Sequence, residues 1–179
     1  MFVLLIMAAP ASAEKADRSK PVNIEANSVT VDDLRKVSVY LGNVILVQGT
    51  MTLKADKIVV HQDAQGFNSA TAYGKPVSFR QKRDGVDEYV EGFADRMQYD
   101  GKPGTLQLYD NAHLKRGADE LHGSYISYNA NTEFFEVKGG DKTGAGKGRV
   151  SAVIQPKPAK PGPAQLPPKP TNDGIQKAP

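Results

Sequence analysis

The chain contains no cysteine and no tryptophan among its 179 residues, and it has only three histidines. Without cysteine there is no disulfide framework and no thiolate ligand for a metal. The histidines, His61, His113 and His122, each stand alone on a predicted strand or strand end. An approach of His113 and His122 across a hairpin is the alternative, but we interpret these side chains as solvent-facing and expect no metal and no cofactor. No uninterrupted apolar run reaches the length of about 20 residues that a membrane-spanning helix needs.

Recognisable catalytic patterns are missing as well. The acidic pairs Asp32-Asp33, Asp87-Glu88 and Asp119-Glu120 all lie in or beside predicted turns, where solvated charge explains them. The glycine-rich run at residues 139–149 lacks the Gly-Lys-Ser/Thr ending of a phosphate-binding loop, and no nucleophile elbow occurs. We therefore predict that the protein is not an enzyme.

The first 13 residues, MFVLLIMAAPASA, resemble the apolar region of a signal peptide that ends in a small-x-small cleavage site. We expect cleavage before Glu14 and export of the mature protein. Since no Lys or Arg precedes the apolar run, the true start codon stays open and a longer leader fits the pattern. A buried N-terminal strand is the alternative interpretation of residues 1–13.

Charge and proline are unevenly distributed. Residues 14–150 carry 19 Lys and Arg against 19 Asp and Glu, whereas residues 156–179 carry four Lys, one Asp and eight of the twelve prolines. The latter composition is typical of an extended polyproline II segment, so we expect a disordered tail over residues 156–179. The neutral body, and the inward position that we expect for its aromatic side chains, argue against a nucleic-acid partner.

Apolar residues recur at every second position through residues 21–155, which indicates strands with one buried face. Turn formers interrupt this alternation every eight to twelve residues or so. We therefore predict an all-β domain over residues 21–155, preceded by a flexible lead-in at residues 14–20. No helical periodicity of useful length occurs.

Two segments that lie 68 residues apart, 41–60 and 109–128, share a pattern. Five of twenty positions are identical: Asn43, Leu46, Gly49, Leu53 and Ile58 recur as Asn111, Leu114, Gly117, Leu121 and Ile126. A shorter motif, small-x-x-apolar-x-apolar, begins at Ala26, Ala55, Ala94 and Gly123. A repeated strand unit with one apolar face stacks into a wrapped sheet that shares an interior. We expect the small residue of each motif to permit a tight bend.

A wrapped sheet that does not close leaves an open edge at each end. The first segment, residues 20–31, and the last, residues 149–156, both alternate in the manner of pairing-competent strands. Two such edges at opposite ends predict head-to-tail self-association, which propagates instead of closing.

The motifs together resemble the LptA family of periplasmic lipopolysaccharide-transport proteins, in the OstA-like group. The resemblance covers nearly all of residues 20–137, and its most specific parts are GNVILVQGTMTLKAD at residues 42–56 and YGKP at residues 73–76. It implies a twisted, open β-jelly roll of repeated antiparallel strand winds in the periplasm. It also implies that the chain binds lipopolysaccharide through lipid A and bridges the inner and outer membranes. An LptC-like partner would then meet the N-terminal edge, and an LptD-like translocon the C-terminal edge.

The inward positions of the strands are the candidate lipid-binding residues. They are Val22, Ile24, Val29, Val31, Val44, Leu46, Ile58, Val60, Val77, Phe79, Met97, Tyr99, Leu106, Leu108, Leu114, Ile126 and Tyr128. The resemblance implies lipid contact at Val22, Ile24, Phe79 and Tyr99 in particular. The alternative is a periplasmic β-repeat scaffold whose interior is packed and whose sheet edges bind partners.

Overall fold

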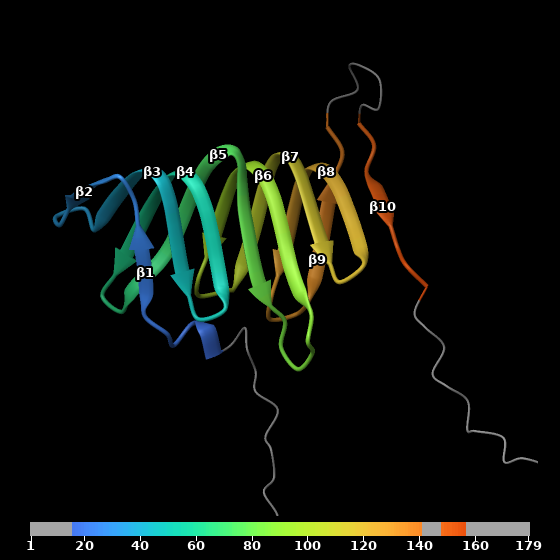
Figure 1. Cartoon of the computed structure of the whole chain (residues 1–179), viewed down its shortest axis with the longest axis horizontal. Coiled ribbons are helices and arrows are strands. Elements are labelled where there is room, and N and C mark those ends of the chain that lie inside the picture. Colours follow the sequence, from blue (N-terminus) through green and yellow to red (C-terminus); the bar gives the residue numbers. More distant parts are fainter. Residues whose placement is uncertain (1–15, 141–147, 157–179) are drawn as a thin grey trace, which may run out of the picture.

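The computed structural model describes residues 16–140 and 148–156, and within these ranges it contains ten β-strands in one antiparallel sheet (Figure 1). The prediction of an all-β protein is confirmed. The predicted signal peptide lies outside the described residues, and so does the predicted tail apart from Pro156. A search of the described residues finds no helix that is long and apolar enough to span a membrane.

Six long strands follow one another along the chain and pair in sequence order. They are β3 (Val37–Gln48), β4 (Met51–Asp63), β5 (Gly66–Lys82), β6 (Tyr89–Asp100), β7 (Thr105–Arg116) and β8 (Asp119–Asn129). Two short strands cover each outer strand. At one edge β1 (Val22–Glu25) and β2 (Ser28–Asp32) both pair with β3; at the other, β9 (Phe134–Lys138) and β10 (Ser151–Val153) both pair with β8.

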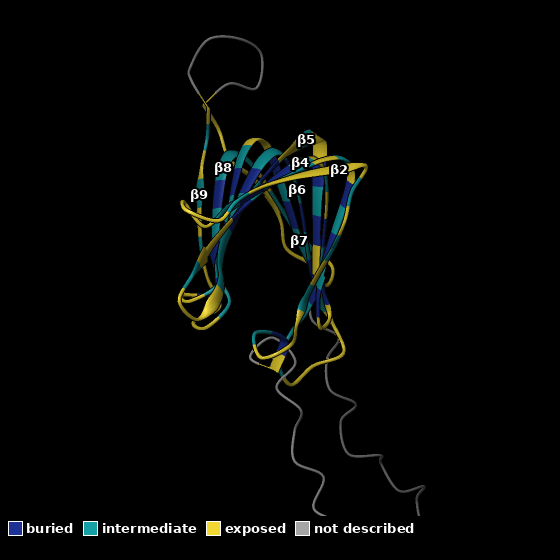
Figure 2. Cartoon of the chain, turned by 90° about the vertical axis from the view of Figure 1, so that its left-hand side faces the viewer, coloured by how far each residue is buried: buried dark blue, intermediate teal, exposed yellow. Residues whose placement is uncertain are grey.

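The long strands all bend near their middles. The pairing register shifts there in each neighbouring pair, at Leu41/Val44, Lys54/Lys57, Tyr73/Val77, Phe93/Arg96 and Tyr109/Ala112. Extra residues in one strand of a pair make the strand kink, and the aligned kinks fold the sheet into an arch of two layers (Figure 2). We call these layers limbs. The first limb comprises residues 28–41, 57–73, 96–109 and 125–138; the second comprises residues 22–25, 44–55, 77–93, 112–123 and 151–153.

The small residues of the short motif lie at this bend, as the sequence predicted. Ala55 and Ala94 fall within register shifts, and Ala26 separates β1 from β2. Gly123 faces the neighbouring strand so closely that an added Cβ would lie 2.6 Å from the backbone oxygen of Lys138. A larger residue at position 123 would therefore force these two strands apart.

The longer repeat also has a structural counterpart. Asn43 and Asn111 both lie in the bend with left-handed φ angles of 47° and 50°. Gly49 and Gly117 both lie in the turn that follows, each with a φ of 60°. Asparagine and glycine tolerate this backbone conformation better than other residues do, which explains why they recur at these positions.

The expectation that aromatic side chains point inward is confirmed for Phe79, Tyr99 and Tyr128 and wrong for Tyr73, Tyr109 and Tyr125, which lie on the outer face. One outward row crosses six strands, from Lys57 through Tyr73, Arg96, Tyr109 and Tyr125 to Lys138. The guanidinium carbon of Arg96 lies 3.8 Å from the ring centre of Tyr109, and Nζ of Lys138 lies 5.1 Å from that of Tyr125. Tyr109 and Tyr125 directly follow or precede the inward residues Leu108 and Ile126, so alternation itself places these rings outward, where cation–π contacts hold them.

Candidate functional site

Three rows of inward side chains run across the sheet from one edge to the other. Each row consists of residues that are Cα partners on successive strands. The rows are Val29, Tyr40, Ile58, Ala72, Met97, Leu108, Ile126 and Val137; Val31, Ser38, Val60, Ala70, Tyr99, Leu106, Tyr128 and Phe135; and, on the second limb, Ile24, Leu46, Leu53, Phe79, Gly92, Leu114, Leu121 and Ala152. We call them the lining rows. Only Ser38 among them carries an aliphatic polar side chain.

The predicted binding residues occupy these rows or lie beside them. All those on β3 to β8 are buried, and the most exposed of them, Tyr99, has 5% of its surface accessible. Val22 and Ile24 on β1 pack against the core from its margin. Val29 and Val31 are in register with the rows but are 53% and 57% exposed, since no described strand lies beyond β2 to cover them.

Sequence reasoning missed several inward residues. Leu53, Ala70, Ala72 and Ala112 are all buried to at least 98%. The alanines gave no signal because a small side chain scores weakly in any alternation pattern. Leu53 could have been found, because it stands directly across the turn from Leu46 at the same parity.

The two limbs touch across the interior. The rings of Phe79 on the second limb and Tyr99 on the first have centres 6.4 Å apart. Gly92 provides a close approach, since an added Cβ would lie 3.0 Å from Cδ2 of Leu108. The interior is therefore closed by apolar packing, and Gly92 makes room for Leu108 of the other limb.

The feet of the limbs face each other along a line that we call the seam, and polar contacts cross it. Nη2 of Arg83, at the foot of the second limb, donates to both carboxylate oxygens of Glu133 at the foot of the first, each at 2.9 Å. A cation–π contact also crosses the seam, since the guanidinium carbon of Arg116 lies 4.9 Å from the ring centre of Phe135. Burial alone would lower the pKa of Arg83, but hydrogen bonds to Glu133 and Glu88 outweigh it and raise that pKa.

Residues 16–20, which we call the strap, also span the seam. They form a helical turn and are held to the body, which differs from the flexible lead-in that we expected. The carboxylate of Asp17 accepts hydrogen bonds from the backbone N–H of Thr50 (2.7 Å), the Thr50 hydroxyl (2.6 Å) and the Gln81 amide (2.9 Å), all on the second limb. Arg18 donates to Oδ1 of Asn131 on the first limb at 2.7 Å. Composition could not reveal these contacts, because the partners lie 33 to 113 residues away.

A cavity of about 250 Å³ opens beside the strap. Its lining combines residues from the strap and from the feet of both limbs: Arg18, Gln48, Asp63, Gln65, Phe67, Gly101 and Lys102. A hydrogen bond from Lys102, and a second from the backbone of Gln65, lower the pKa of Asp63. The carboxylate is therefore charged at neutral pH, and this opening in the seam is polar.

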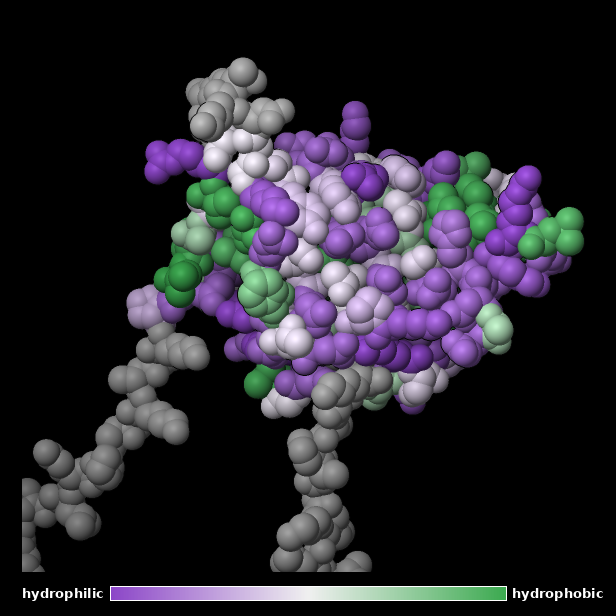
Figure 3. Space-filling model, turned by 180° about the vertical axis from the view of Figure 1, so that it is seen from behind, coloured by the Kyte–Doolittle hydropathy of each residue, from purple (hydrophilic) through white to green (hydrophobic). Residues whose placement is uncertain are grey.

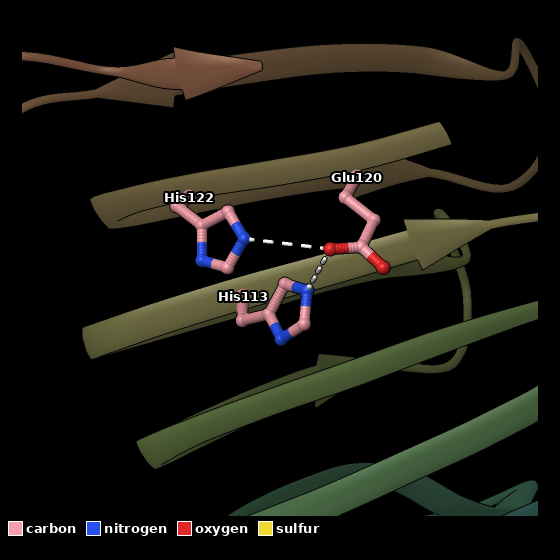
Figure 4. A group of neighbouring side chains, drawn as sticks. All are labelled: His113, Glu120 and His122. Carbon is pink, nitrogen blue, oxygen red and sulfur yellow. Dashed lines mark ion pairs between the residues drawn. The ribbon is translucent and has the colours of Figure 1, made fainter. Parts of the chain in front are cut away.

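Two histidines and a glutamate form a cluster on the outer face of the second limb (Figure 4). His113 on β7 and His122 on β8 are Cα partners, and their rings stack with centres 4.0 Å apart and planes at 11°. Both side chains face outward as expected, and the register of the β7–β8 pair brings them side by side across the hairpin, which is the alternative that the sequence left open. Burial, and then the neighbouring His122, lower the pKa of His113. A hydrogen bond from Lys115 lowers the pKa of Glu120, whose carboxylate lies between the two histidines and Lys115.

Comparison with known proteins gives one consistent family. Residues 23–134 match the family model described as LptA/(LptD N-terminal domain) LPS transport protein. The lipopolysaccharide export system protein LptA of Haemophilus influenzae is 30% identical over 156 residues, which is 86% of this chain and 87% of that protein. LptA of Escherichia coli K12 is 35% identical over 127 residues, covering 70% and 68% of the two chains.

A solved structure has the same fold. The crystal structure of LptH from Pseudomonas aeruginosa, described as the LptA-homologous periplasmic component of the lipopolysaccharide transport device, superposes with a TM-score of 0.71. The two chains are 27% identical, and the match covers 78% of this chain and 99% of LptH. An open, folded sheet of this kind is the LptA-type jelly roll, as the sequence predicted. The chain belongs to the LptA/LptD N-terminal family of lipopolysaccharide-transport proteins.

Proposed function

We propose that this chain is a non-enzymatic bridge protein that carries lipopolysaccharide through the periplasm, with the acyl chains of lipid A held between its two limbs. The observation that carries the proposal is the continuity of the lining rows. They consist of aliphatic and aromatic side chains from β1 and β2 to β9 and β10, and the polar groups among them are the hydroxyls of Ser38 and three tyrosines. Family membership supports the substrate and the compartment. Export by way of residues 1–13 remains a prediction.

The physical need for such a protein follows from the hydrophobic effect. Burying a methylene group is worth about 0.8 kcal/mol, so a chain of about ten methylenes gains roughly 8 kcal/mol when it leaves water. Several such chains on one lipid cannot cross an aqueous space unshielded. Rows of Val, Leu, Ile and Phe shelter them without a deep specific pocket, which favours release as well as binding.

Loading requires the limbs to part, because in the structure they touch. Acyl chains that enter between Phe79 and Tyr99 replace one apolar contact with another, so the interior contributes little net resistance. The polar contacts across the seam have no such replacement. We therefore place the entry route at the seam. The strap and the Arg83–Glu133 pair hold the two limbs together there and have to be released before lipid can enter.

Both ends of the sheet support head-to-tail assembly. The side of the molecule shown in Figure 3 is mainly hydrophilic in its middle, whereas hydrophobic side chains gather towards both ends. Val29 and Val31 are exposed at the N-terminal edge; Val153 and Ile154 are 47% and 76% exposed at the C-terminal edge. In this scheme an LptC-like protein adds to β1 and β2, and an LptD-like translocon adds to β9 and β10. We expect Val31→Asp to lower the self-association constant in sedimentation, with the exposed turn variant Leu34→Asp as the control.

A scaffold with a permanently packed interior is the second candidate function. The contact between the limbs and the burial of the lining favour it. In that case the edges alone would bind partners, and lipid would never reach Phe79.

Photo-crosslinking separates the two functions. A photoreactive phenylalanine analogue replaces Phe79, which is inward and 2% exposed, or Phe93, which lies on the outer face in a row with His113. Each folded protein is incubated with lipopolysaccharide or with phospholipid. We expect a lipopolysaccharide adduct at position 79 that exceeds both the phospholipid adduct and the adduct at position 93. Equal labelling at the two positions, or none at position 79, would support the scaffold.

A further inference from the structure

The outer face of β7 and β8 gathers three metal-binding side chains from the described part of the chain. His113 and His122 are cross-strand partners, and Glu120 precedes His122 by two residues, so all three project from the same face. Oε2 of Glu120 lies 3.6 Å from Nε2 of His113 and 3.7 Å from Nε2 of His122. The three ligand atoms all lie within 4.8 Å of one another (Figure 4).

We propose that His113, Glu120 and His122 form a binding site for a divalent transition-metal ion of borderline softness, Zn²⁺ in particular. Around tetrahedral zinc, ligand atoms at about 2.0–2.1 Å lie roughly 3.3 Å apart. Small side-chain rotations bring the two nitrogens and the oxygen to that spacing. Two imidazoles and one carboxylate are donors that suit zinc, copper or nickel better than magnesium or calcium, which prefer oxygen.

A second observation points to a ligand at this place. Nε2 of His113 is buried, and it has no hydrogen-bond partner among the described residues, because the Glu120 oxygen is out of range at 3.6 Å. A buried nitrogen that makes no hydrogen bond is costly, and in proteins an ion or a water commonly accounts for such a group. A metal ion bound to the lone pair of this nitrogen would satisfy it.

The neighbouring side chains leave the ligand atoms available. Nζ of Lys115 lies 2.9 Å from Oε1 of Glu120, so Oε2 is the oxygen left to face the imidazoles. The ring of Phe93 stacks on His113 at a centre distance of 5.8 Å and fixes the orientation of that imidazole. The positive charge of Lys115 opposes cation binding, so we expect a weaker site than a closed structural zinc site.

The site lies beside the C-terminal edge of the sheet. β10 pairs with β8 at the same residues, with Ser151 opposite His122 and Val153 opposite Glu120. An ion held by β7 and β8 would brace the strand on which the C-terminal edge is built. This inference is independent of lipid binding, because all three side chains are on the outer face and the lining rows are on the inner one.

The test is a calorimetric titration of the full chain, produced without a histidine tag, with ZnCl₂ and separately with MgCl₂. We expect one zinc per chain and no magnesium binding. His113→Gln, His122→Gln and Glu120→Gln should each weaken zinc binding at least about tenfold, since even residues that only orient metal ligands change affinity by 10–100-fold. His61→Gln is the matched control, because it removes the third histidine, an exposed one on β4 outside the cluster.

Thermal unfolding gives a second measurement. Zinc at about 100 times its dissociation constant should raise Tm by roughly 5–10 °C in the unchanged chain and in His61→Gln. The cluster variants should show no such rise, and circular dichroism establishes that they are folded. The proposal is overturned if zinc gives no saturable heat, or if His61→Gln loses as much affinity as His113→Gln.

Discussion

The interior of the arch and the seam at its foot are closed by different kinds of contact. Inside, apolar side chains such as Leu108 meet across the limbs with no directional bonds, and less than 1% of Leu108 is exposed. At the seam, Asp17 and Arg83 make short hydrogen bonds whose partners lie far away in the sequence. Apolar contacts can be exchanged for lipid, whereas directional polar contacts have to be broken. We therefore expect the interior to set the stability of the fold, and we propose that the seam controls access to it.

The largest effect is expected in the interior. Leu108→Ala should reduce the free energy of unfolding by about 2–5 kcal/mol, because it removes buried methyl groups and leaves a cavity where the limbs meet. Leu34→Ala is the matched control, since Leu34 is 98% exposed in the turn between β2 and β3 and should change stability little. Urea denaturation measures both. Equal losses in the two variants would mean that the limbs do not depend on each other.

Much of this interior could be predicted from the sequence, because the pattern that reveals it is local in the chain. Alternation depends only on neighbours in the chain, so Leu46, Ile58 and Phe79 were assigned to the inside before any register was known, and all are buried. The bend was also predictable in part, because Ala55 and Gly123 are small where the strands crowd.

The seam could not be predicted in the same way, and the meeting of the two histidines was open only as an alternative. Arg83 and Glu133 are 50 residues apart, and only the folded arch brings their charges together. His113 and His122 meet because the turn at Gly117 fixes the register of β7 and β8. A period-two pattern gives the face on which a residue lies, but it does not give the partner across the strand.

The next largest effect is expected in the strap. Asp17→Ala should reduce the free energy of unfolding by about 1–3 kcal/mol, because it leaves the buried amide of Gln81 without its acceptor. If the seam controls access, this variant should also take up lipopolysaccharide faster than the unchanged chain. Asp33→Ala, in an exposed turn, is the control for the loss of one carboxylate. A loss of stability above about 3 kcal/mol would show that the strap belongs to the core, and the contrast between the regions would fail.

The smallest effect on stability, and the most specific one on access, is expected at the Arg83–Glu133 pair. Glu133 is 43% exposed at its side chain, so Glu133→Ala should cost at most about 1 kcal/mol. Salt weakens exposed ion pairs, and uptake of lipopolysaccharide by the unchanged chain should therefore become faster as salt rises. Glu133→Ala has no Arg83–Glu133 pair for salt to screen. Its uptake of lipopolysaccharide should therefore be fast already at low salt and change less when salt is added. Stopped-flow measurement of both proteins over a salt series tests this. An identical salt response in the two would place the barrier to loading inside the arch, between Phe79 and Tyr99, and not at the seam.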